Sequence, residues 1–404
     1  VTFVVPGDFG AMEMFCRRHL VAFARTAACW PRGLPACKRF SHQLQSSGGL
    51  QQAVGSAFSP SAGQGLQFHK GKPKVSGPVT PEKLHQVLSS SFSQFDWSNA
   101  RLFRITGGVT NQVYKVIFEE TSPRSAPLLL RVFGPGHIDR EVDSEILAWL
   151  GENSIAPQTV GHFGNGRLEV FLEPSRQLQR DELPRFERQI AVELSRVHAV
   201  ELPEKLVRLL APRGDIWTNI GDQWSSAQGF IDCSLPIASG SLGAEVKAQL
   251  RELDGIVDRL QSVVPEGLTK AFCHNDAHTG NVLVVEDDGV IFVDWEYCGI
   301  NFVAADIANH WCERIYSAEA VDGTLDLTSF PSERQRREFI EAYLGPGASE
   351  ASVDALLQEV MAFVPALHIQ WGLWGVNEAM VLGRVKFDYL NYGRGRLAEA
   401  LKLM

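Results

Sequence analysis

The sequence lacks three features that would assign a protein to a broad class at once: regular cysteine spacing, a long apolar run and an excess of positive charge. Its seven cysteines are odd in number and none forms a Cys-x-x-Cys pair, which indicates reduced thiols in a cytosol-like compartment. No apolar run approaches the ~18 residues that span a bilayer. The formal net charge of −9 argues against a nucleic-acid partner. We therefore expect neither a membrane span nor nucleic-acid binding.

Acidic residues are almost missing from the first 79 positions. This segment has two acids against nine Lys and Arg residues, and it ends in a stretch rich in Gln, Ser and Gly. A disordered tail is the interpretation that we favour, and an organelle transit peptide of acid-poor composition is the alternative. We exclude residues 1–79 from the fold and expect a cytoplasmic protein, unless this leader directs it to an organelle.

The remaining residues have the composition of a soluble globular protein, with 45% hydrophobic and 21% charged residues over the 404-residue chain. From 80 to 172 the pattern predicts a helix, three strands around a Gly-rich turn, a second helix and a hairpin at Asn165-Gly166. From 173 to 404 helical spacing dominates, with two late helices expected on either side of Pro365. We therefore expect an α+β fold with a small antiparallel sheet lobe (80–172) and a mainly helical lobe (173–404).

The motif with the clearest chemistry lies between residues 272 and 297. His274-x-Asp276 and Asn281 stand on a loop, an expected hairpin follows, and Asp294 comes directly after it. Phosphoryl transfer from a magnesium nucleotide needs this set, because one Asp deprotonates the attacking hydroxyl while an Asn and another Asp hold the metal. Two protein ligands are enough for Mg²⁺. An ordinary hairpin with polar turn residues is the alternative, but three required residues in this order favour a protein-kinase catalytic loop.

A short Gly-rich turn, Thr-Gly-Gly-Val-Thr-Asn at 106–111, separates two of the expected strands. Adjacent glycines let the backbone approach phosphates, although a plain hairpin turn fits equally well. The expected nucleotide contacts in this turn are Gly107, Gly108, Thr110 and Asn111. Arg131 ends the next strand, where a kinase places the base that contacts the α- and β-phosphates. An acid on the following helix should orient this arginine, and spacing does not choose among Glu141, Asp143 and Glu145.

With these residues identified, the chain resembles the choline/ethanolamine kinase family. The resemblance covers roughly residues 102–401 and implies a protein-kinase-like fold. It rests on His274-Asn275-Asp276 with Gly280-Asn281, Val293 to Tyr297, Asp306 to Glu313, and Trp371-Gly372-Leu373-Trp374. Aminoglycoside phosphotransferases share the catalytic loop but are not expected to share the last two stretches, so they are the second choice. A kinase-like nucleotide-binding scaffold without catalysis is disfavoured, because a scaffold needs none of the three motif residues.

The resemblance implies phosphorylation of the hydroxyl of choline or ethanolamine with ATP and Mg²⁺, the first step of the CDP-choline/CDP-ethanolamine route to phospholipids. Asp276 is then the catalytic base, and Asn281 and Asp294 bind Mg²⁺. Arg131 contacts phosphate, and Glu296 lies near the metal and the phosphates. The departures from the family, Trp295 and Ala277-His278, remove no group that the mechanism needs. The expected partner is a small amino alcohol, with a homodimer as a further option.

Aromatic residues near the end of the chain suggest how the amino alcohol is held. A quaternary ammonium cannot donate a hydrogen bond, so aromatic faces and nearby carboxylates bind it. Helical spacing also fits aromatics that merely fill the core, and only the resemblance reverses that preference. The candidate substrate contacts, beside Asp276 and Glu296, are Tyr297, Glu313, Trp371, Trp374, Tyr389 and Tyr392. The sequence leaves open whether choline or ethanolamine is preferred, with a slight lean towards choline.

Overall fold

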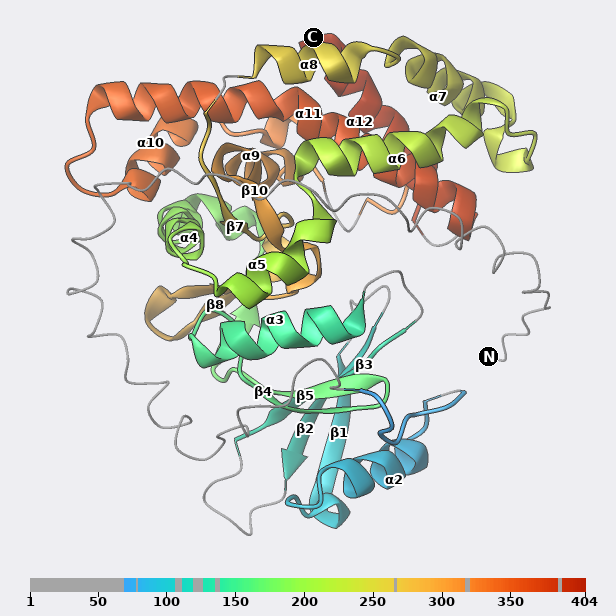
Figure 1. The fold of residues 1–404 in the computed structure, drawn as a ribbon, viewed down its shortest axis with the longest axis vertical. Helices are drawn as coiled ribbons and strands as arrows, with labels where there is room; N and C mark the ends of the chain where they lie inside the picture. Colours follow the sequence, from blue (N-terminus) through green and yellow to red (C-terminus); the bar gives the residue numbers. More distant parts are fainter. Residues whose placement is uncertain are drawn as a thin grey trace. The chain divides into compact units, whose positions relative to one another are not determined.

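The structure is a computed structural model that describes residues 69–404 except 78, 106–110, 119–125, 135–138, 265–266, 317–319 and 384–386. These residues belong to one compact unit, Gln51–Met404 (Figure 1). The described strands are β1 (Ala100–Ile105), β2 (Gln112–Phe118), β3 (Leu128–Val132), β4 (Thr159–Phe163), β5 (Gly166–Val170), β6 (Ser175–Gln177), β7 (Lys270–Cys273), β8 (Val282–Val285), β9 (Val290–Phe292) and β10 (Gly299–Phe302). The described helices are α2 (Pro81–Ser91), α3 (Arg140–Glu152), α4 (Leu183–His198), α5 (Glu204–Leu210), α6 (Ile216–Ile231), α7 (Gly240–Glu252), α8 (Ile256–Val263), α9 (Val303–Glu313), α10 (Glu333–Leu344), α11 (Glu350–Leu382) and α12 (Tyr389–Leu403).

The first five strands form one antiparallel sheet in the order β1-β2-β3-β5-β4. Each strand expected between 102 and 172 is present within a few residues of its predicted bounds. Leu128, Leu130 and Val132 of β3 are buried in a cluster to which α2 adds Leu84 and Leu88. Because side chains alternate along a strand, Arg131 lies on the opposite face of the sheet from this cluster.

Residues just before the first expected helix also pack on this sheet. The carbonyl of Pro73 accepts a hydrogen bond of 2.6 Å from the Gly164 N–H. Val75 is buried, and its N–H donates to Asn165 Oδ1 at 2.8 Å. His69 contacts the carbonyl of Phe163 through Nδ1 at 2.6 Å. We therefore assign residues 69–77 to the folded lobe, whereas the sequence suggested that it starts at residue 80. Residues 1–68 of the expected leader lie outside the described part.

Helices dominate the chain after β5, as expected. The apolar residues of α4 at 186, 190, 194 and 197 are buried in the main core. Two small antiparallel sheets lie among these helices: β6 pairs with the β8–β9 hairpin, and β7 pairs with β10. Helix α3 contacts both β4 of the first sheet and α5 of the helical region (Figure 1). The prediction of a sheet-containing N-terminal region followed by a mainly helical one is confirmed.

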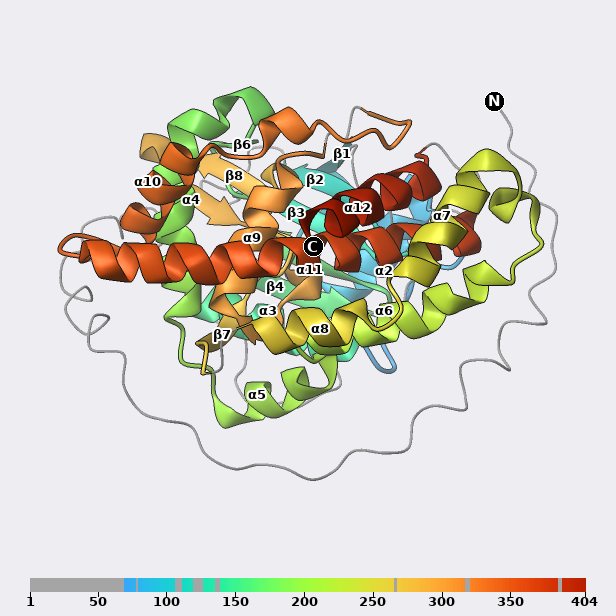
Figure 2. The same cartoon turned by 90° about the horizontal axis from the view of Figure 1, so that it is seen from above.

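The two late helices expected on either side of Pro365 are one continuous helix, α11 (Figure 2). Proline removes one backbone hydrogen bond, and here tertiary packing outweighs that loss. The residues around Pro365, from Phe363 to Leu367, are buried apart from the proline itself. The helix contacts α6, α9, α10 and α12. Helical continuity is therefore set by contacts that no local pattern reveals.

Helix α11 is also long and apolar enough, by length and composition alone, to cross a membrane. Its contacts with α6, α8, α9, α10 and α12 make it a core element of the fold in this structure. The expectation that the chain has no membrane span is compatible with this packing. The cytoplasmic location and the homodimer stay predictions.

Candidate active site

The loop after β7 is pinned in place by a buried histidine. His274 Nε2 contacts the carbonyl of Val293 at 3.1 Å, and Nδ1 accepts a hydrogen bond of 3.2 Å from the Asp276 N–H. The imidazole packs against the ring of Trp295 with centroids 4.6 Å apart. Burial lowers the pKa of His274, which favours the neutral tautomer that these contacts require. The histidine of the motif thus ties the loop of Asp276 to the residue before Asp294.

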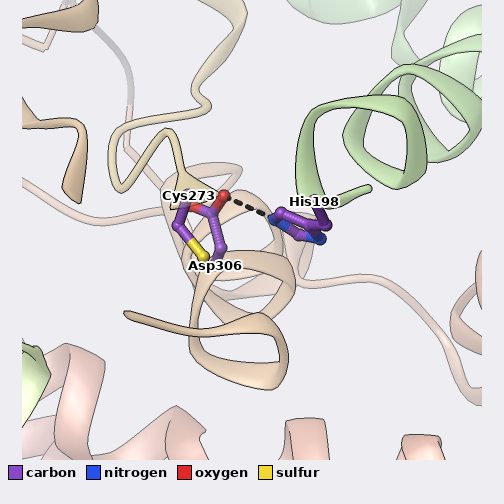
Figure 3. Close-up of side chains that lie close together, drawn as sticks. All are labelled: His198, Cys273 and Asp306. Atoms are coloured by element: carbon purple, nitrogen blue, oxygen red, sulfur yellow. Dashed lines mark hydrogen bonds and ion pairs between the residues drawn. The ribbon is translucent and has the colours of Figure 1, made fainter. Parts of the chain in front are cut away.

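A second anchor holds the same loop from α9. Asp306 is fully buried, and its carboxylate accepts hydrogen bonds from the backbone N–H groups of His274 (2.9 Å) and Asn275 (2.7 Å). His198 Nε2 lies 2.9 Å from Asp306 Oδ2, and a dashed line marks this contact in Figure 3. Burial alone would raise the pKa of Asp306, but the hydrogen bond from His198 reverses the effect and the pKa is lowered. The lowered pKa favours the ionised carboxylate, which accepts the hydrogen bonds of the loop backbone.

Cys273 lies beside this pair, and the three side chains could geometrically hold a metal ion (Figure 3). Two observations count against that use. Both oxygens of Asp306 already accept hydrogen bonds, and burial raises the pKa of Cys273 well above its usual value. A zinc-type ligand would have to be a thiolate. We interpret the group as a brace for the catalytic loop.

Asp276 and Asn281 are in direct contact at the end of the loop. Asn281 Nδ2 donates to both the backbone oxygen and Oδ2 of Asp276, each at 2.9 Å. Burial, followed by the negative charges of Glu313 and Asp294, raises the pKa of Asp276 well above its usual value. His278 is not placed as a base, because its Nδ1 accepts the Gly280 N–H at 2.9 Å. The loop therefore brings an acid and an amide together, as the motif predicts.

Asp294 follows β9 with a left-handed backbone (φ 65°, ψ 62°), a conformation that is unusual outside glycine. Its Oδ1 lies 3.3 Å from Arg131 Nη1 of β3. Glu296 lies 3.9 Å from Arg140 Nη1 of α3. Burial and the charge of Asp294 raise the pKa of Glu296 to about 7. The sheet lobe and the helical lobe thus meet at the acids that the motif singled out.

The expected acid partner of Arg131 is not on the helix that follows it. Asp143 pairs with Arg167, Glu145 pairs with Lys205, and Glu141 accepts the backbone N–H of His69. Among the described residues, the ion pairs of Arg131 go to Asp294 and to Glu169, at 3.3 and 3.8 Å. The expectation was wrong because it assumed that the helix reaches the arginine directly, whereas Arg167 and Glu169 lie between them.

Of the Gly-rich turn, Gly107, Gly108 and Thr110 lie outside the described residues. Asn111 is described and buried, and its Oδ1 accepts a hydrogen bond of 3.4 Å from the Gly134 N–H. Asn111 therefore links the end of the turn to the chain after β3, close in sequence to Arg131.

The predicted aromatic residues form a continuous set of edge-to-face contacts. Tyr297 meets Trp371 with centroids 6.0 Å apart, and Trp371 meets Trp374 at 5.5 Å. Trp374 in turn meets Tyr389 at 5.5 Å and Tyr392 at 6.1 Å. Tyr297 is 41% exposed, while Tyr389 and Tyr392 are buried. The group is thus part core and part accessible surface.

Three residues near this group were missed from the sequence. Tyr316 and Phe387 add rings, each within 5.8 Å of Tyr392. Arg396 of α12 is fully buried and donates to Glu313 Oε1 at 2.6 Å. Glu313, the expected acid, is therefore already paired. Phe387 and Tyr316 were weakly indicated by the sequence, since each lies within three residues of a predicted substrate contact. Arg396 was not indicated by the sequence.

Tyr297 connects the aromatic group to the catalytic loop. Its backbone oxygen accepts a hydrogen bond of 2.9 Å from Asn275 Nδ2, while its ring contacts Trp371. Loss of solvent around the hydroxyl group, followed by the negative charge of Asp276, raises the pKa of Tyr297 even though its ring is partly exposed. A small ligand in contact with the rings would therefore lie near Asp276.

The comparisons with known proteins agree with this geometry. The family model for choline/ethanolamine kinase matches residues 102–401.

The chain belongs to the choline/ethanolamine kinase family.

Curated relatives in this family include a probable choline kinase of Arabidopsis thaliana, which is 29% identical over 340 residues that cover 80% of this chain and 93% of the relative. A choline/ethanolamine kinase of Mus musculus is 30% identical over 319 residues, covering 72% of this chain and 77% of the relative. Among solved structures, the ethanolamine kinase of Plasmodium vivax aligns with a TM-score of 0.68 and 25% identity, covering 81% of this chain and 91% of that one.

The solved structure of a spectinomycin phosphotransferase also aligns with this chain, with a TM-score of 0.51 and 16% identity. The alignment covers 81% of this chain and all of the phosphotransferase. At that identity the likeness shows the fold alone. The predicted family, the kinase class of enzyme and the protein-kinase-like fold are confirmed. The roles of individual site residues stay predictions.

Proposed function

We propose that this chain transfers the γ-phosphoryl group of ATP, with Mg²⁺, to the hydroxyl of choline or ethanolamine. The observation that carries the proposal is the link through Tyr297 between the Asp276–Asn281 pair and the aromatic group. The link supports the proposal, because a carboxylate of the kind that activates hydroxyl groups then lies near aromatic rings of the kind that bind organic cations. The phosphorylated product would enter the CDP-choline/CDP-ethanolamine route to phospholipids.

Asp276 is the proposed base. Its carboxylate is oriented by Asn281 Nδ2 and by the loop that His274 and Asp306 hold. The substrate hydroxyl would donate its proton to Asp276 as its oxygen bonds to the γ-phosphorus, while the bond from that phosphorus to the β-phosphate oxygen breaks and ADP leaves. The raised pKa of Asp276 arises from burial and neighbouring acids, so positive charge brought close to those acids would lower it again.

The donor set fits a magnesium ion. Asn281 directs its amide nitrogen to Asp276, which leaves the amide oxygen as a ligand, and the Asp294 carboxylate is 37% exposed. Oxygen donors of this kind suit Mg²⁺. A metal bound there would neutralise charge that develops on the transferred phosphoryl group. Arg131 would turn its guanidinium from Asp294 towards the phosphates, a movement of one side chain.

Apolar residues on the Arg131 face of the sheet are proposed to cover the adenine ring. Val113 lies directly opposite Arg131, and Ile105 lies directly opposite Val113, so all three share one face. Ile105 and Phe103 are among the exposed large hydrophobic residues of the described chain. An exposed apolar strip beside a phosphate-binding arginine suits a purine nucleotide.

We propose choline as the preferred substrate. The ring group offers aromatic faces, whereas Glu313 is paired with Arg396 and so is a poorer acceptor for the N–H groups of ethanolamine. Burial is the main cause of the raised pKa of Tyr297 and Tyr389. Glu378, which lies one helical turn beyond Trp374, raises both pKa values further through its negative charge. That charge favours a cation without requiring a hydrogen-bond donor.

Purified protein incubated with ATP, Mg²⁺ and each candidate acceptor tests the function. Phosphocholine and phosphoethanolamine would be measured separately, and competition between the two acceptors gives the ratio of kcat/KM. A product from neither amino alcohol would remove the proposal. A product from aminoglycosides alone would favour the related phosphotransferases, and nucleotide binding without any product would favour a scaffold.

A further inference from the structure

Two arginines stand side by side on the sheet face that meets the active site. Arg131 of β3 and Arg167 of β5 are direct cross-strand partners, so their side chains emerge on the same face. Like charges in directly opposite positions destabilise a sheet unless acids compensate them. Glu169, two residues along β5, shares that face. Its Oε1 pairs with Arg167 Nε and lies 3.8 Å from Arg131 Nε.

Arg167 is the interior member of this group. It is 4% exposed, and its Nη1 lies 2.7 Å from Asp143 Oδ2 of α3. Its guanidinium carbon lies 5.4 Å from the ring centroid of Phe133. Burial disfavours the charge of Arg167, but Glu169 and Asp143 outweigh it and raise the pKa of this arginine. Arg167 is therefore a fixed cation with both acids bound to it, and it leaves Glu169 little freedom to rotate.

Arg131 is the member that reaches the site. Its side chain is 12% exposed, with Nε directed to Glu169 and Nη1 to Asp294. The Nε atom is buried and has no hydrogen-bond partner among the described residues, so Glu169 is its compensating charge. A carboxylate held by Arg167 thus lies beside Nε of Arg131, while Nη1 is the group that would exchange Asp294 for a phosphate oxygen in the proposed function.

We propose that Glu169 is the positioning residue of Arg131, and that helix α3 supports the nucleotide site through the chain Arg131–Glu169–Arg167–Asp143. The inference rests on the proposed function, in which Arg131 binds nucleotide phosphates. The sequence predicted a direct ion pair between Arg131 and an acid of α3. In the proposed arrangement, Glu169 and Arg167 connect Arg131 to Asp143 of α3 instead. Glu169 and Asp143 then matter for nucleotide affinity, whereas Glu141 and Glu145 on the same helix do not.

Calorimetric titration of the full-length chain with ADP and Mg²⁺ tests this without turnover. Glu169→Gln keeps the shape of the side chain and removes its charge. We expect about a tenfold to hundredfold weaker ADP affinity, because the variant loses both the charge that faces Arg131 and the ionised hydrogen bond to Arg167 that holds that charge in place. In the kinase assay the KM for ATP should rise, while kcat at saturating ATP changes less. Glu145→Gln is the matched control and should bind ADP with the affinity of the wild-type chain.

A double-mutant cycle separates positioning from general destabilisation. If Glu169 acts through Arg131, then Glu169→Gln should cost no further ADP affinity in the Arg131→Gln variant. Equal losses in both backgrounds, or wild-type affinity in Glu169→Gln, would overturn the inference. A large loss in Glu141→Gln would also overturn it, in favour of a direct contact from α3.

Two further outcomes keep the test decisive. If circular dichroism shows that Glu169→Gln is unfolded, Asp143→Asn takes its place in the same cycle. This substitution removes the acid that holds Arg167, and it lies one residue further along the chain of contacts from Arg131. If the wild-type chain binds no ADP, the proposed function itself fails. That result is distinct from a wild-type chain that binds ADP and a Glu169→Gln variant that binds it equally well.

Discussion

Replacement of Asp306 by asparagine should weaken both the fold and the catalytic loop. The carboxylate accepts two backbone N–H groups of the loop and contacts His198 Nε2, all between 2.7 and 2.9 Å. Asparagine has the same shape but has one oxygen fewer and no charge. Whichever oxygen becomes the amide group, at least one buried donor then meets another donor.

The loss in the free energy of unfolding can be worked out from those contacts. One buried N–H left without an acceptor costs about 1–3 kcal/mol, and the two remaining hydrogen bonds each lose the extra ~1 kcal/mol that an ionised acceptor supplies. The sum is about 3–5 kcal/mol, a large part of the ~5–15 kcal/mol by which domains of this kind are stable. We expect a folded but clearly weakened variant.

The same carboxylate predicts the effect of pH. The pKa of Asp306 is lower in the folded chain than its ordinary value, so the folded state binds protons less readily than the unfolded one. Its contribution to stability is therefore complete above about pH 4 and is lost as the pH falls below that value. The Asp306→Asn variant should lack this part of the acid destabilisation.

Urea unfolding followed by circular dichroism at pH 7 and at acid pH measures both effects, and kcat reports the state of the loop. Asp96→Asn is the control for the comparison at pH 7, because Asp96 is an exposed carboxylate that accepts the Ser98 N–H at the start of a helical turn, a position that Asp and Asn favour about equally. An Asp306→Asn variant within about 1 kcal/mol of the wild-type chain, given the contacts above, would refute this reasoning.

Three further predictions concern catalysis, substrate binding and the start of the fold. Asp276→Asn should lower kcat by about 10²–10⁴ with ADP binding retained, as loss of a general base requires; turnover within tenfold of the wild type would contradict the assignment. Trp374→Ala should raise the KM for choline about thirtyfold, the equivalent of a desolvated cation–π contact, and leave the KM for ATP unchanged. A shortened chain that begins at residue 69 should melt at the temperature of the full chain, whereas one that begins at residue 78 should melt lower, because it lacks the contacts of Pro73 and Val75 with the β4–β5 turn. Equal melting temperatures for the two shortened chains would show that these contacts add nothing.

The catalytic loop could be predicted because its chemistry is local in sequence. Asp276 and Asn281 are five residues apart, and one hairpin separates them from Asp294. Within so short a span, few folds other than a loop and a hairpin are available, so the residue types already indicate the geometry. The strands of the first sheet were predictable for a similar reason, since the residues that bound them, such as the Gly-rich turn and Asn165-Gly166, are local signals.

The partners of charged residues were not predictable, because an ion pair depends on which elements the fold brings together. Arg396 lies 83 residues from Glu313, and Arg131 lies 38 residues from Glu169. Helix periodicity correctly placed Asp143 on the helix after Arg131, but the register of β3 against β5 put Arg167 between them. A motif therefore identifies the groups that perform chemistry. The groups that hold them in place follow from strand register and helix packing, and they are the residues whose substitution separates binding from turnover.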